Sequence, residues 1–430
     1  MRLRNPDLFQ KIRQAIEKIP IFDTHEHFPL EKERLRHPKH FGYYWHYVME
    51  DITKAGFASD LLQLVLSDYF AQSKDVVSKF WELWSYCKNT GYGTALRLFF
   101  KELFGIDEID EATLPRMNEA IANRVHAGWY DFVLDKANIK YCIRTVWSFE
   151  PHYCEFKRLF PAPIFDHFAL IRSKQDLKQI EADVDLDIKN FDTYLTALVK
   201  SFQQRVNERM ISVKIFLAYN RALDIGDATQ TEAERLFEAI ISGKFKGAPW
   251  NCETKKFEDF IMHRIVELAE SLDLPIQIHT GMQNGNFQMI HHGNPLYLQE
   301  FLMAHPRARF DLFHGGYPFL HEYVALCKTF PNVSANLAWL YVLCPSAAKY
   351  LLNQLIETVP VNRIHGFGGD YNFVEGAYAH AKIARDAIAN VLTEKIITDE
   401  LNEEDAYQLA KQILWNSPLE FYQMNRFLND

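Results

Sequence analysis

Eight short apolar runs recur along the chain, and helical patterns separate the later ones. Most runs are rich in Ile, Val and Phe with little polar alternation, which is typical of strands buried on both faces. Strands that alternate with helices form parallel sheets. Eight such units predict an α/β fold, the (β/α)8 or TIM barrel. The runs end at His25, Trp147, Leu170, Tyr219, Thr280, Gly316, Trp339 and Asp370.

The spacing between the runs supports the barrel. His279 and His314 are 35 residues apart, about one β/α unit, and His314 and Asp370 are 56 apart, close to two units. The main alternative is an open, doubly wound sheet. The first run, however, lacks the G-x-G-x-x-G turn with which such sheets bind dinucleotides.

The interval between the first and second runs is too long for a loop. Residues 30–135 contain aromatic, helix-like patterns, for example at 76–87 and 93–104. They predict a helical insertion that distorts the barrel, within a single barrel domain over residues 1–430. Because it follows the first strand, we expect the insertion to lie at the carboxyl end of the barrel, over any active site. Its aromatic residues also offer a surface for a partner subunit, so a homo-oligomer is an open alternative to a monomer.

Charge and composition narrow the class of function. The 430 residues carry a net charge of −9, which argues against nucleic acid as a partner. The six cysteines include no C-x-x-C pair, so free thiols in a reducing cytoplasm fit best. The N-terminus resembles an amphipathic helix rather than a signal peptide, and no apolar stretch is long enough to cross a bilayer. We therefore expect a cytoplasmic protein that acts on a small molecule.

Residues that can bind a metal stand in or just after five of the predicted strands. His25 and His27 point the same way because strand residues two apart share a face, so both can hold one cation. Taken singly, each residue has an ordinary explanation, such as a packed histidine, a helix-capping aspartate or a paired lysine. Together, at the strand ends where barrel enzymes place catalytic groups, they predict a metal centre. The residues are His25, His27, Lys214, His279, His314 and Asp370.

In the order H-x-H, Lys, His, His and Asp, these residues resemble the amidohydrolase superfamily, and within it the amidohydrolase-related (amidohydrolase 2) group. The segment "IQIHTGMQNGN…GNPLYLQEFLMAHPRARFDLFHGGYPF" is similar to the amidohydrolase domains related to type I glutamine synthetases. The long insertion resembles that of the uronate isomerases more distantly. The likeness is strong over residues 210–385 and around the H-x-H pair, and weak over 30–140.

The resemblance implies a divalent metal centre with one or two ions, most often zinc, with manganese or iron as alternatives. It places the more buried ion on His25, His27 and Asp370. A second ion would be bound by His279 and His314. These assignments follow from the family pattern and not from spacing alone.

The resemblance also gives roles to Lys214 and to two of the ligands. Lys214, carboxylated by CO2, would bridge the two ions, a modification that requires a neutral amine. If Lys214 stays an amine, the site would hold one ion and His314 would orient the attacking water or a substrate oxygen. Asp370 would take a proton from the water and pass it to the leaving group. Many relatives have serine where this chain has Gly369, which we expect to alter the support of the site rather than abolish metal binding.

The favoured function is a metal-dependent hydrolase that cleaves a C–N or C–O bond of a small carbonyl compound. A mononuclear decarboxylase or uronate-type isomerase on the same fold is the first alternative. A catalytically inactive metal-binding scaffold is the second, and the complete ligand set argues against it. Candidate substrate contacts near the strand ends are Arg221, Asn294, Tyr317 and Trp339, with Arg144 and Trp147 as further candidates.

Overall fold

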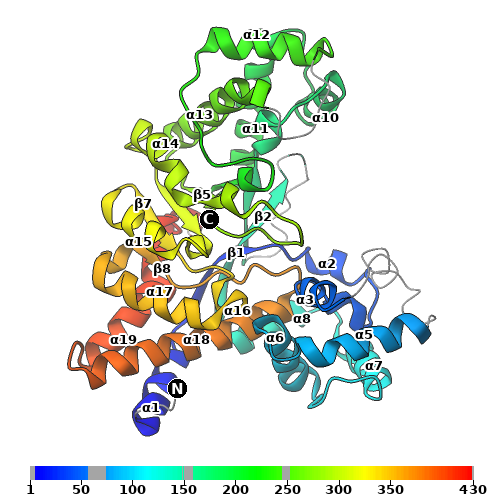
Figure 1. The fold of residues 1–430 in the computed structure, drawn as a ribbon, viewed down its shortest axis with the longest axis vertical. Helices are drawn as coiled ribbons and strands as arrows, with labels where there is room; N and C mark the ends of the chain where they lie inside the picture. Colours follow the sequence, from blue (N-terminus) through cyan, green and yellow to red (C-terminus); the bar gives the residue numbers. More distant parts are fainter. Residues whose placement is uncertain (1–4, 57–73, 148, 150–157, 245–251, 429–430) are drawn as a thin grey trace.

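An eight-stranded parallel sheet forms the centre of the molecule, and its strands neighbour one another in chain order (Figure 1). Parallel strands in this order build a TIM barrel, so the predicted fold class is confirmed. The strands are β1 (Ile21–Glu26), β2 (Ile139–Trp147), β3 (Leu159–Ile164), β4 (Val213–Ile215), β5 (Ile276–His279), β6 (Phe310–Phe313), β7 (Val333–Asn336) and β8 (Ile364–His365). The computed structural model describes residues 5–56, 74–147, 149, 158–244 and 252–428.

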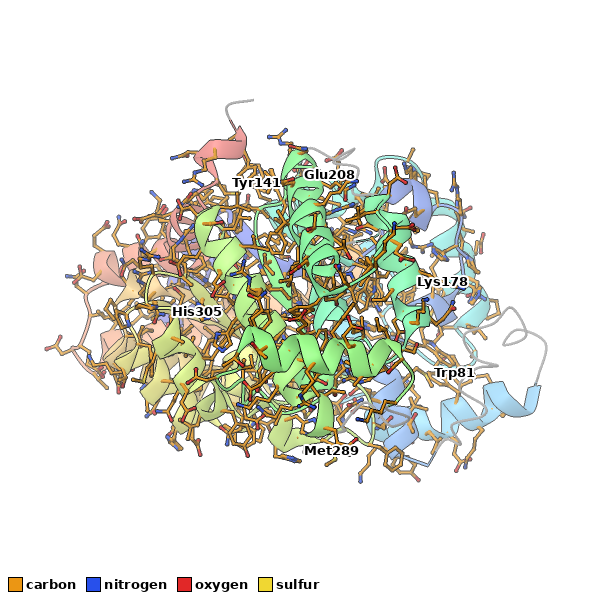
Figure 2. All side chains as sticks on the ribbon, turned by 90° about the horizontal axis from the view of Figure 1, so that it is seen from above. Trp81, Tyr141, Lys178, Glu208, Met289 and His305 are labelled. Atoms are coloured by element: carbon orange, nitrogen blue, oxygen red, sulfur yellow. The ribbon has the colours of Figure 1, made fainter. Side chains whose placement is uncertain are left out.

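Burial on both faces explains the apolar composition of the strands. Every residue of β1, β3 and β5 is buried. Seen from above, side chains crowd the interior of the molecule behind the helices at the front (Figure 2). This packing is the buried environment that the continuous apolar runs predict.

The barrel closes between β8 and β1 through the segment that follows β8. Thr24 N donates to the carbonyl of Phe367 (3.2 Å), and Asp370 N donates to the carbonyl of His25 (2.8 Å). His27 N donates to the carbonyl of Tyr371 (3.1 Å). The same backbone bonds therefore complete the barrel and bring Asp370 beside the histidine pair.

Most helices lie on the outside of the barrel. Before β1 lies α1 (Pro6–Glu17). Between β3 and β5 lie α9 (Asp166–Ala169), α10 (Lys174–Val184), α11 (Phe191–Asn207), η4 (Leu217–Tyr219), α12 (Gln230–Ile241), η5 (Cys252–Thr254) and α13 (Lys255–Ser271). Between β5 and β8 lie η6 (Ile290–Gly293), η7 (Pro295–Leu298), α14 (Gln299–Ala304), η8 (His314–Gly316), α15 (Leu320–Thr329), α16 (Leu340–Leu343), α17 (Pro345–Thr358) and η9 (Val361–Arg363). After β8 come α18 (Val374–Ile397), α19 (Glu403–Lys411), η10 (Gln412–Asn416), α20 (Ser417–Phe421) and α21 (Asn425–Leu428).

Helix α12 shows how local sequence sets these elements. Thr229 Oγ1 accepts a hydrogen bond from Glu232 N (3.3 Å), and the Glu232 carboxylate accepts one from Thr229 N (2.9 Å). This capping box satisfies backbone donors that the first turn leaves free. The helix then buries one face at helical spacing, made of Ala233, Leu236, Phe237 and Ile240.

Helices also occupy the chain between β1 and β2, where the sequence predicts an insertion. They pack around an aromatic core in which Trp45 stacks on Phe80 at 3.8 Å between ring centroids. Helices α6 and α8 contact α18, and α6 also contacts α16, so the segment rests on the barrel's own helices (Figure 1). The elements are α2 (Glu31–Arg34), η1 (Phe41–Tyr44), α3 (Val48–Lys54), α5 (Lys74–Cys87), α6 (Gly91–Phe99), η3 (Phe100–Phe104), α7 (Leu114–Arg124) and α8 (Trp129–Ala137).

Glu50 on α3 joins this helical segment to the loop that follows β5. Its carboxylate accepts a hydrogen bond from Gly285 N (3.0 Å), and its backbone carbonyl accepts one from Asn286 Nδ2 (3.4 Å). Burial raises the pKa of Glu50 to about 7, and the bond from Gly285 offsets this only in part. A carboxyl group with a raised pKa therefore lies where the helical segment meets the barrel.

This pKa predicts a pH-dependent stability. Between about pH 4.5 and 7 the folded chain keeps a proton on Glu50 that the unfolded chain has released, so this group destabilises the fold as pH rises and has no further effect above 7. Relative to wild type, we expect Glu50→Gln to gain up to about 3 kcal/mol in unfolding free energy between pH 4.5 and 8, at about 1.4 kcal/mol per pKa unit. Urea unfolding at both pH values measures the change. Glu238→Gln, at an exposed position on α12, is the control, and a difference that does not change with pH would contradict the prediction.

Candidate metal centre and adjoining cavity

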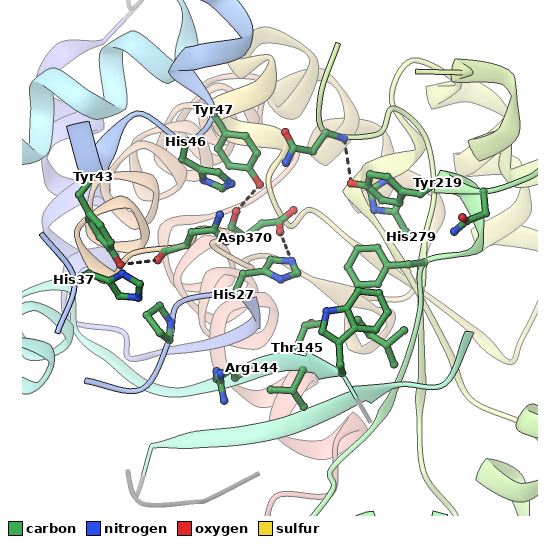
Figure 3. A pocket seen from close by; sticks show the side chains of 18 residues that line it. His27, His37, Tyr43, His46, Tyr47, Arg144, Thr145, Tyr219, His279 and Asp370 are labelled. Atoms are coloured by element: carbon green, nitrogen blue, oxygen red, sulfur yellow. Dashed lines mark hydrogen bonds and ion pairs between the residues drawn. The ribbon is translucent and has the colours of Figure 1, made fainter. Parts of the chain in front are cut away.

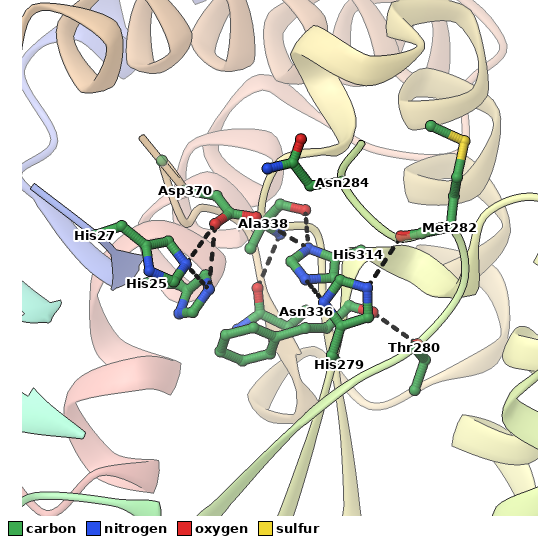
Figure 4. Close-up of polar contacts among 12 residues, drawn as sticks. His25, His27, His279, Thr280, Met282, Asn284, His314, Asn336, Ala338 and Asp370 are labelled. Carbon is green, nitrogen blue, oxygen red and sulfur yellow. Dashed lines mark hydrogen bonds and ion pairs between the residues drawn. The ribbon is translucent and has the colours of Figure 1, made fainter. Parts of the chain in front are cut away.

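Three side chains meet where β1 and the segment after β8 lie side by side. The Asp370 oxygen Oδ1 lies 3.2 Å from His25 Nε2 and 3.0 Å from His27 Nε2 (Figure 4). The two Nε2 atoms are 3.2 Å apart. Two imidazole nitrogens therefore face a single carboxylate oxygen, as the H-x-H spacing predicts.

His314, the first residue of η8 after β6, and His279, the last residue of β5, adjoin this group. His314 Nδ1 lies 3.7 Å from Asp370 Oδ2, and His314 Nε2 lies 2.9 Å from His279 Nδ1. His279 Nε2 is 3.0 Å from the carbonyl of Met282 (Figure 4). Ligand atoms of His25, His314 and Asp370 all lie within 4.8 Å of one another.

The donor set fits a divalent cation. Burial lowers the pKa of His25 and of His314 well below the usual histidine value, and lowers that of His279 to about 3, so these imidazoles are neutral and each has one unprotonated nitrogen. Thr145 Oγ1 lies 3.0 Å from His25 Nδ1, which leaves His25 Nε2 to face Asp370. Neutral imidazoles together with one carboxylate are ligands that zinc and related ions accept.

Asp370 keeps its negative charge. Burial alone would raise its pKa, but the adjacent His25, His27 and His314 lower it well below the usual aspartate value. Its backbone is left-handed (φ +60°), a conformation that aspartate adopts more readily than most residues. The Tyr47 hydroxyl donates to the Asp370 carbonyl and helps to hold this conformation.

A cavity of about 710 Å³ opens beside this group (Figure 3). His27, His279 and Asp370 line it, so possible metal ligands face the space that a substrate would occupy. Among the described lining residues, the one Lys or Arg side chain is Arg144 and the one carboxylate is Asp370. The helical segment between β1 and β2 adds His37, Tyr43, His46 and Tyr47.

Comparison with known protein families shows to which family the chain belongs. The sequence model of a family described as amidohydrolase matches residues 208–424, just over half of the 430 residues. This chain belongs to the amidohydrolase family. The predicted resemblance to the amidohydrolase-related group is thereby confirmed.

One similar protein and two similar structures can be compared with this amidohydrolase individually. "Protein fluG" from Emericella nidulans is 24% identical over 253 residues, and the match covers 56% of this chain but only 29% of that protein. The structure of uronate isomerase from Thermotoga maritima has a TM-score of 0.79 at 16% identity and covers 98% of each chain. The structure of glucuronate isomerase from Caulobacter crescentus has a TM-score of 0.80 at 18% identity and covers 99% of this chain and 96% of that one. At these identities the two structures show a shared fold alone.

Lys214 on β4 lies close to the predicted ligands His25 and His279, whose pKa values its charge helps to lower. Its side chain is fully buried, and its Nζ has no hydrogen-bond partner among the described residues. Nζ lies 3.9 Å from the ring centroid of Phe313 and 4.8 Å from that of Phe216. Burial lowers the pKa of Lys214 to about 7, so much of this amine is neutral near neutral pH.

The four residues predicted to bind substrate lie elsewhere, and none of them is among the described residues that line the cavity. Arg221 pairs with Asp259 (2.8 Å), Glu258 (3.1 Å) and Asp224 (3.2 Å). The remaining three residues have structural contacts: the Asn294 side chain accepts a hydrogen bond from Leu296 N, the Tyr317 carbonyl accepts one from Met282 N, and Trp339 packs 5.4 Å from His314 between ring centroids. Their role in substrate binding stays a prediction.

Two features of the amidohydrolase site are absent from the sequence prediction. One is the identity of the wall residues His46 and Tyr47: the sequence predicts that the helical segment covers the site, but no periodicity indicates which of its side chains reach the cavity. The other is a buried acid pair formed by Asp23 and Glu26 on β1. Burial, and then the charge of Asp23, raises the pKa of Glu26 well above the usual value, and burial raises the pKa of Asp23 to about 6. Glu26 is the acidic residue between the two histidines of H-x-H, and this position is the sequence signal from which the pair could have been predicted.

None of the described helices is both long and apolar enough to span a membrane. The cysteines whose side chains are described, Cys87, Cys142, Cys327 and Cys344, are free thiols.

Proposed function

We propose that this amidohydrolase is a metal-dependent hydrolase that cleaves a C–N or C–O bond of a small carbonyl compound. The observation that carries the proposal is the position of Asp370, which lies within 3.2 Å of two histidine nitrogens and also lines the cavity. Asp370 thus adjoins the two histidines and can also reach a reacting water in the cavity.

His25, His27, His314 and Asp370 would hold the first divalent ion, with zinc favoured and manganese or iron as alternatives. When bound, the ion lowers the pKa of a water and polarises a substrate carbonyl. Asp370 accepts the proton of the attacking water at its carboxylate and returns it to the leaving group. Buried neutral histidines exclude solvent on the barrel side, so the water enters from the cavity.

Lys214 and His279 bear on the number of ions. A neutral, unpartnered amine in the barrel is the form that can react with CO2 to give a carbamate. A carbamate at Lys214 would add a negative charge beside His279 and His314 and so favour a second ion there. An amine would favour a single ion, with His314 orienting the water or the substrate.

Arg144 supports a substrate with a carboxylate. Its Nε donates to the carbonyl of Phe28 (3.0 Å), which fixes the guanidinium on the cavity wall next to the residue that follows His27. Guanidinium groups bind carboxylates in a fork geometry. A small acid with a hydrolysable amide or ester bond therefore matches the two groups that line the cavity, Arg144 and Asp370.

For Arg144→Gln we expect KM for a carboxylate-bearing substrate to rise by about 10- to 100-fold, as the loss of a charge-assisted contact of about 1.5–3 kcal/mol implies. The uncharged methyl ester or amide of the same compound should be turned over equally by both proteins. Initial rates on the matched pair of substrates measure the effect. An equal loss on both compounds would mean that Arg144 does not bind the carboxylate.

A uronate-type isomerase is the second candidate, and one observation favours it. The fold shared with uronate isomerase covers 98% of both chains, so it extends through the helical segment between β1 and β2. Uronates carry a carboxylate, which Arg144 would also bind.

A substrate panel separates the candidates. The zinc-loaded protein would be given N-acyl amino acids, lactones of sugar acids and free uronates, with release of amine or acid, formation of ketose and release of CO2 measured in parallel. Hydrolysis of an amide or lactone supports the proposal. Isomerisation of a uronate or decarboxylation without hydrolysis would replace it, and no turnover at full metal loading would favour a binding scaffold.

A further inference from the structure

Glu26 lies between the two histidines of the H-x-H pair and points to the other side of β1, where it is fully buried. Its Oε2 accepts a hydrogen bond from Tyr371 N (2.8 Å). Backbone bonds from Asp370 N to the His25 carbonyl (2.8 Å) and from His27 N to the Tyr371 carbonyl (3.1 Å) flank this contact. Glu26 therefore ties β1 to the residue directly after Asp370.

Asp23 secures the residue directly before Asp370. Its Oδ1 accepts hydrogen bonds from Gly369 N (3.0 Å) and from His25 N (3.1 Å). The Asp23 and Glu26 carboxyl groups also lie close enough for each to shift the pKa of the other. Two neighbouring carboxyl groups thus hold the backbone on both sides of Asp370.

A side chain at position 369 would occupy the space that the Glu26 carboxyl group fills. A Cβ at position 369 would overlap Oε1 of Glu26 and lie 2.7 Å from its Cδ and 3.2 Å from its Oε2. The backbone of Gly369 does not require glycine, because its φ is not positive. The requirement for glycine at this position comes from the carboxyl group of Glu26.

We propose that Glu26 and Gly369 form a matched pair that positions Asp370 for metal binding. Asp370 has a left-handed backbone (φ +60°), and such a conformation persists only where surrounding contacts hold it. The Glu26 carboxyl fills the space that glycine leaves, and it accepts its hydrogen bond from Tyr371 N, which is not a proposed metal ligand. Glu26 is thus a positioning residue, and the inference rests on the metal centre of the proposed function.

Cobalt(II) binding tests the pair without an activity assay. Metal-free protein would be titrated with Co²⁺, whose visible absorption spectrum reports the ligand geometry, and each variant's thermal midpoint would be measured without metal. For Glu26→Ala and for Gly369→Ala we expect a 10- to 100-fold weaker Co²⁺ affinity and a changed spectrum. The loss of contacts that orient a metal-binding residue has about this effect. Glu26→Gln should stay close to wild type, because its amide oxygen can accept the bond from Tyr371 N.

The double variant supplies the decisive comparison. In Glu26→Ala/Gly369→Ala the added Cβ meets no carboxyl group, so the second substitution should cause no further loss of affinity. If Glu26→Ala does not fold, Glu26→Asp withdraws the carboxyl group and allows the same comparison. Glu258→Ala removes another buried carboxyl group, one that pairs with Arg172 (2.8 Å), and should lower the thermal midpoint without changing the spectrum.

Two outcomes overturn the pair. One is wild-type Co²⁺ affinity and spectrum in both single variants, and the other is additive losses in the double variant. Wild-type protein that binds no Co²⁺ would instead overturn the metal centre, and the pair with it.

Discussion

Asp370→Asn should lower kcat/KM by about 10³-fold or more, since general acid–base groups contribute about 10²–10⁴ and a metal ligand is weakened as well. The asparagine amide has nearly the same shape but cannot accept the proton of the attacking water. The backbone bond from residue 370 N to the His25 carbonyl is unaffected, so the fold should remain. Initial rates across the pH range, with metal content measured in parallel, test the prediction.

A matched substitution separates chemistry from folding in this experiment. Asp259→Asn changes another buried aspartate, which pairs with Arg221 (2.8 Å) and Lys255 (2.7 Å) away from the cavity. It should lower stability and leave kcat close to wild type. Activity of Asp370→Asn within about tenfold of wild type would remove Asp370 from the catalytic role, because a general base contributes more than that.

Removal of the metal should abolish the activity. Among the described residues that line the cavity, Asp370 is the one carboxylate, and without an ion none of them lowers the pKa of a water enough for attack at neutral pH. Dialysis against a chelator should reduce turnover by at least about 10³-fold, and zinc, manganese or iron(II) should restore it. Elemental analysis of protein purified without a metal-binding tag gives the ion count.

The ion count also assigns Lys214. About two ions per chain in wild type and about one in Lys214→Met would support a carbamate bridge, as in two-metal sites. About one ion in both proteins would favour the amine and a mononuclear reaction. Full activity after chelation, with no metal detected, would contradict the metal centre as a whole.

Much of the fold follows from the sequence because strand patterns are local. The run predicted over residues 139–147 is β2 (Ile139–Trp147) in the structure. The eighth run is shorter than predicted, since β8 ends at His365 and the chain continues to Asp370 without a strand. Gly368 and Gly369 allow this segment to lie against the side chains of Thr24, His25 and Glu26, where larger residues would clash. Such packing is decided by residues more than 300 positions away and cannot be read from the run itself.

The candidate site, like the fold, has one part that the sequence predicts and one part that it does not. The order of His25, His27, His279, His314 and Asp370 along the strands brings them together because parallel strands end at one edge of the barrel. The cavity wall depends instead on how the helical segment docks, which no periodicity encodes. Substrate residues chosen for lying near strand ends, such as Arg221, have structural partners instead.

The seam between β8 and β1 has a thermodynamic consequence. Asp370 belongs to the segment that closes the barrel, so an ion bound between it and the β1 histidines stabilises the closed seam by the free energy of its own binding. Metal affinity and resistance to local opening are then one linked quantity. Any substitution that loosens the seam would then weaken metal binding, and a bound ion would in turn strengthen the place where the barrel has no pairing between β8 and β1.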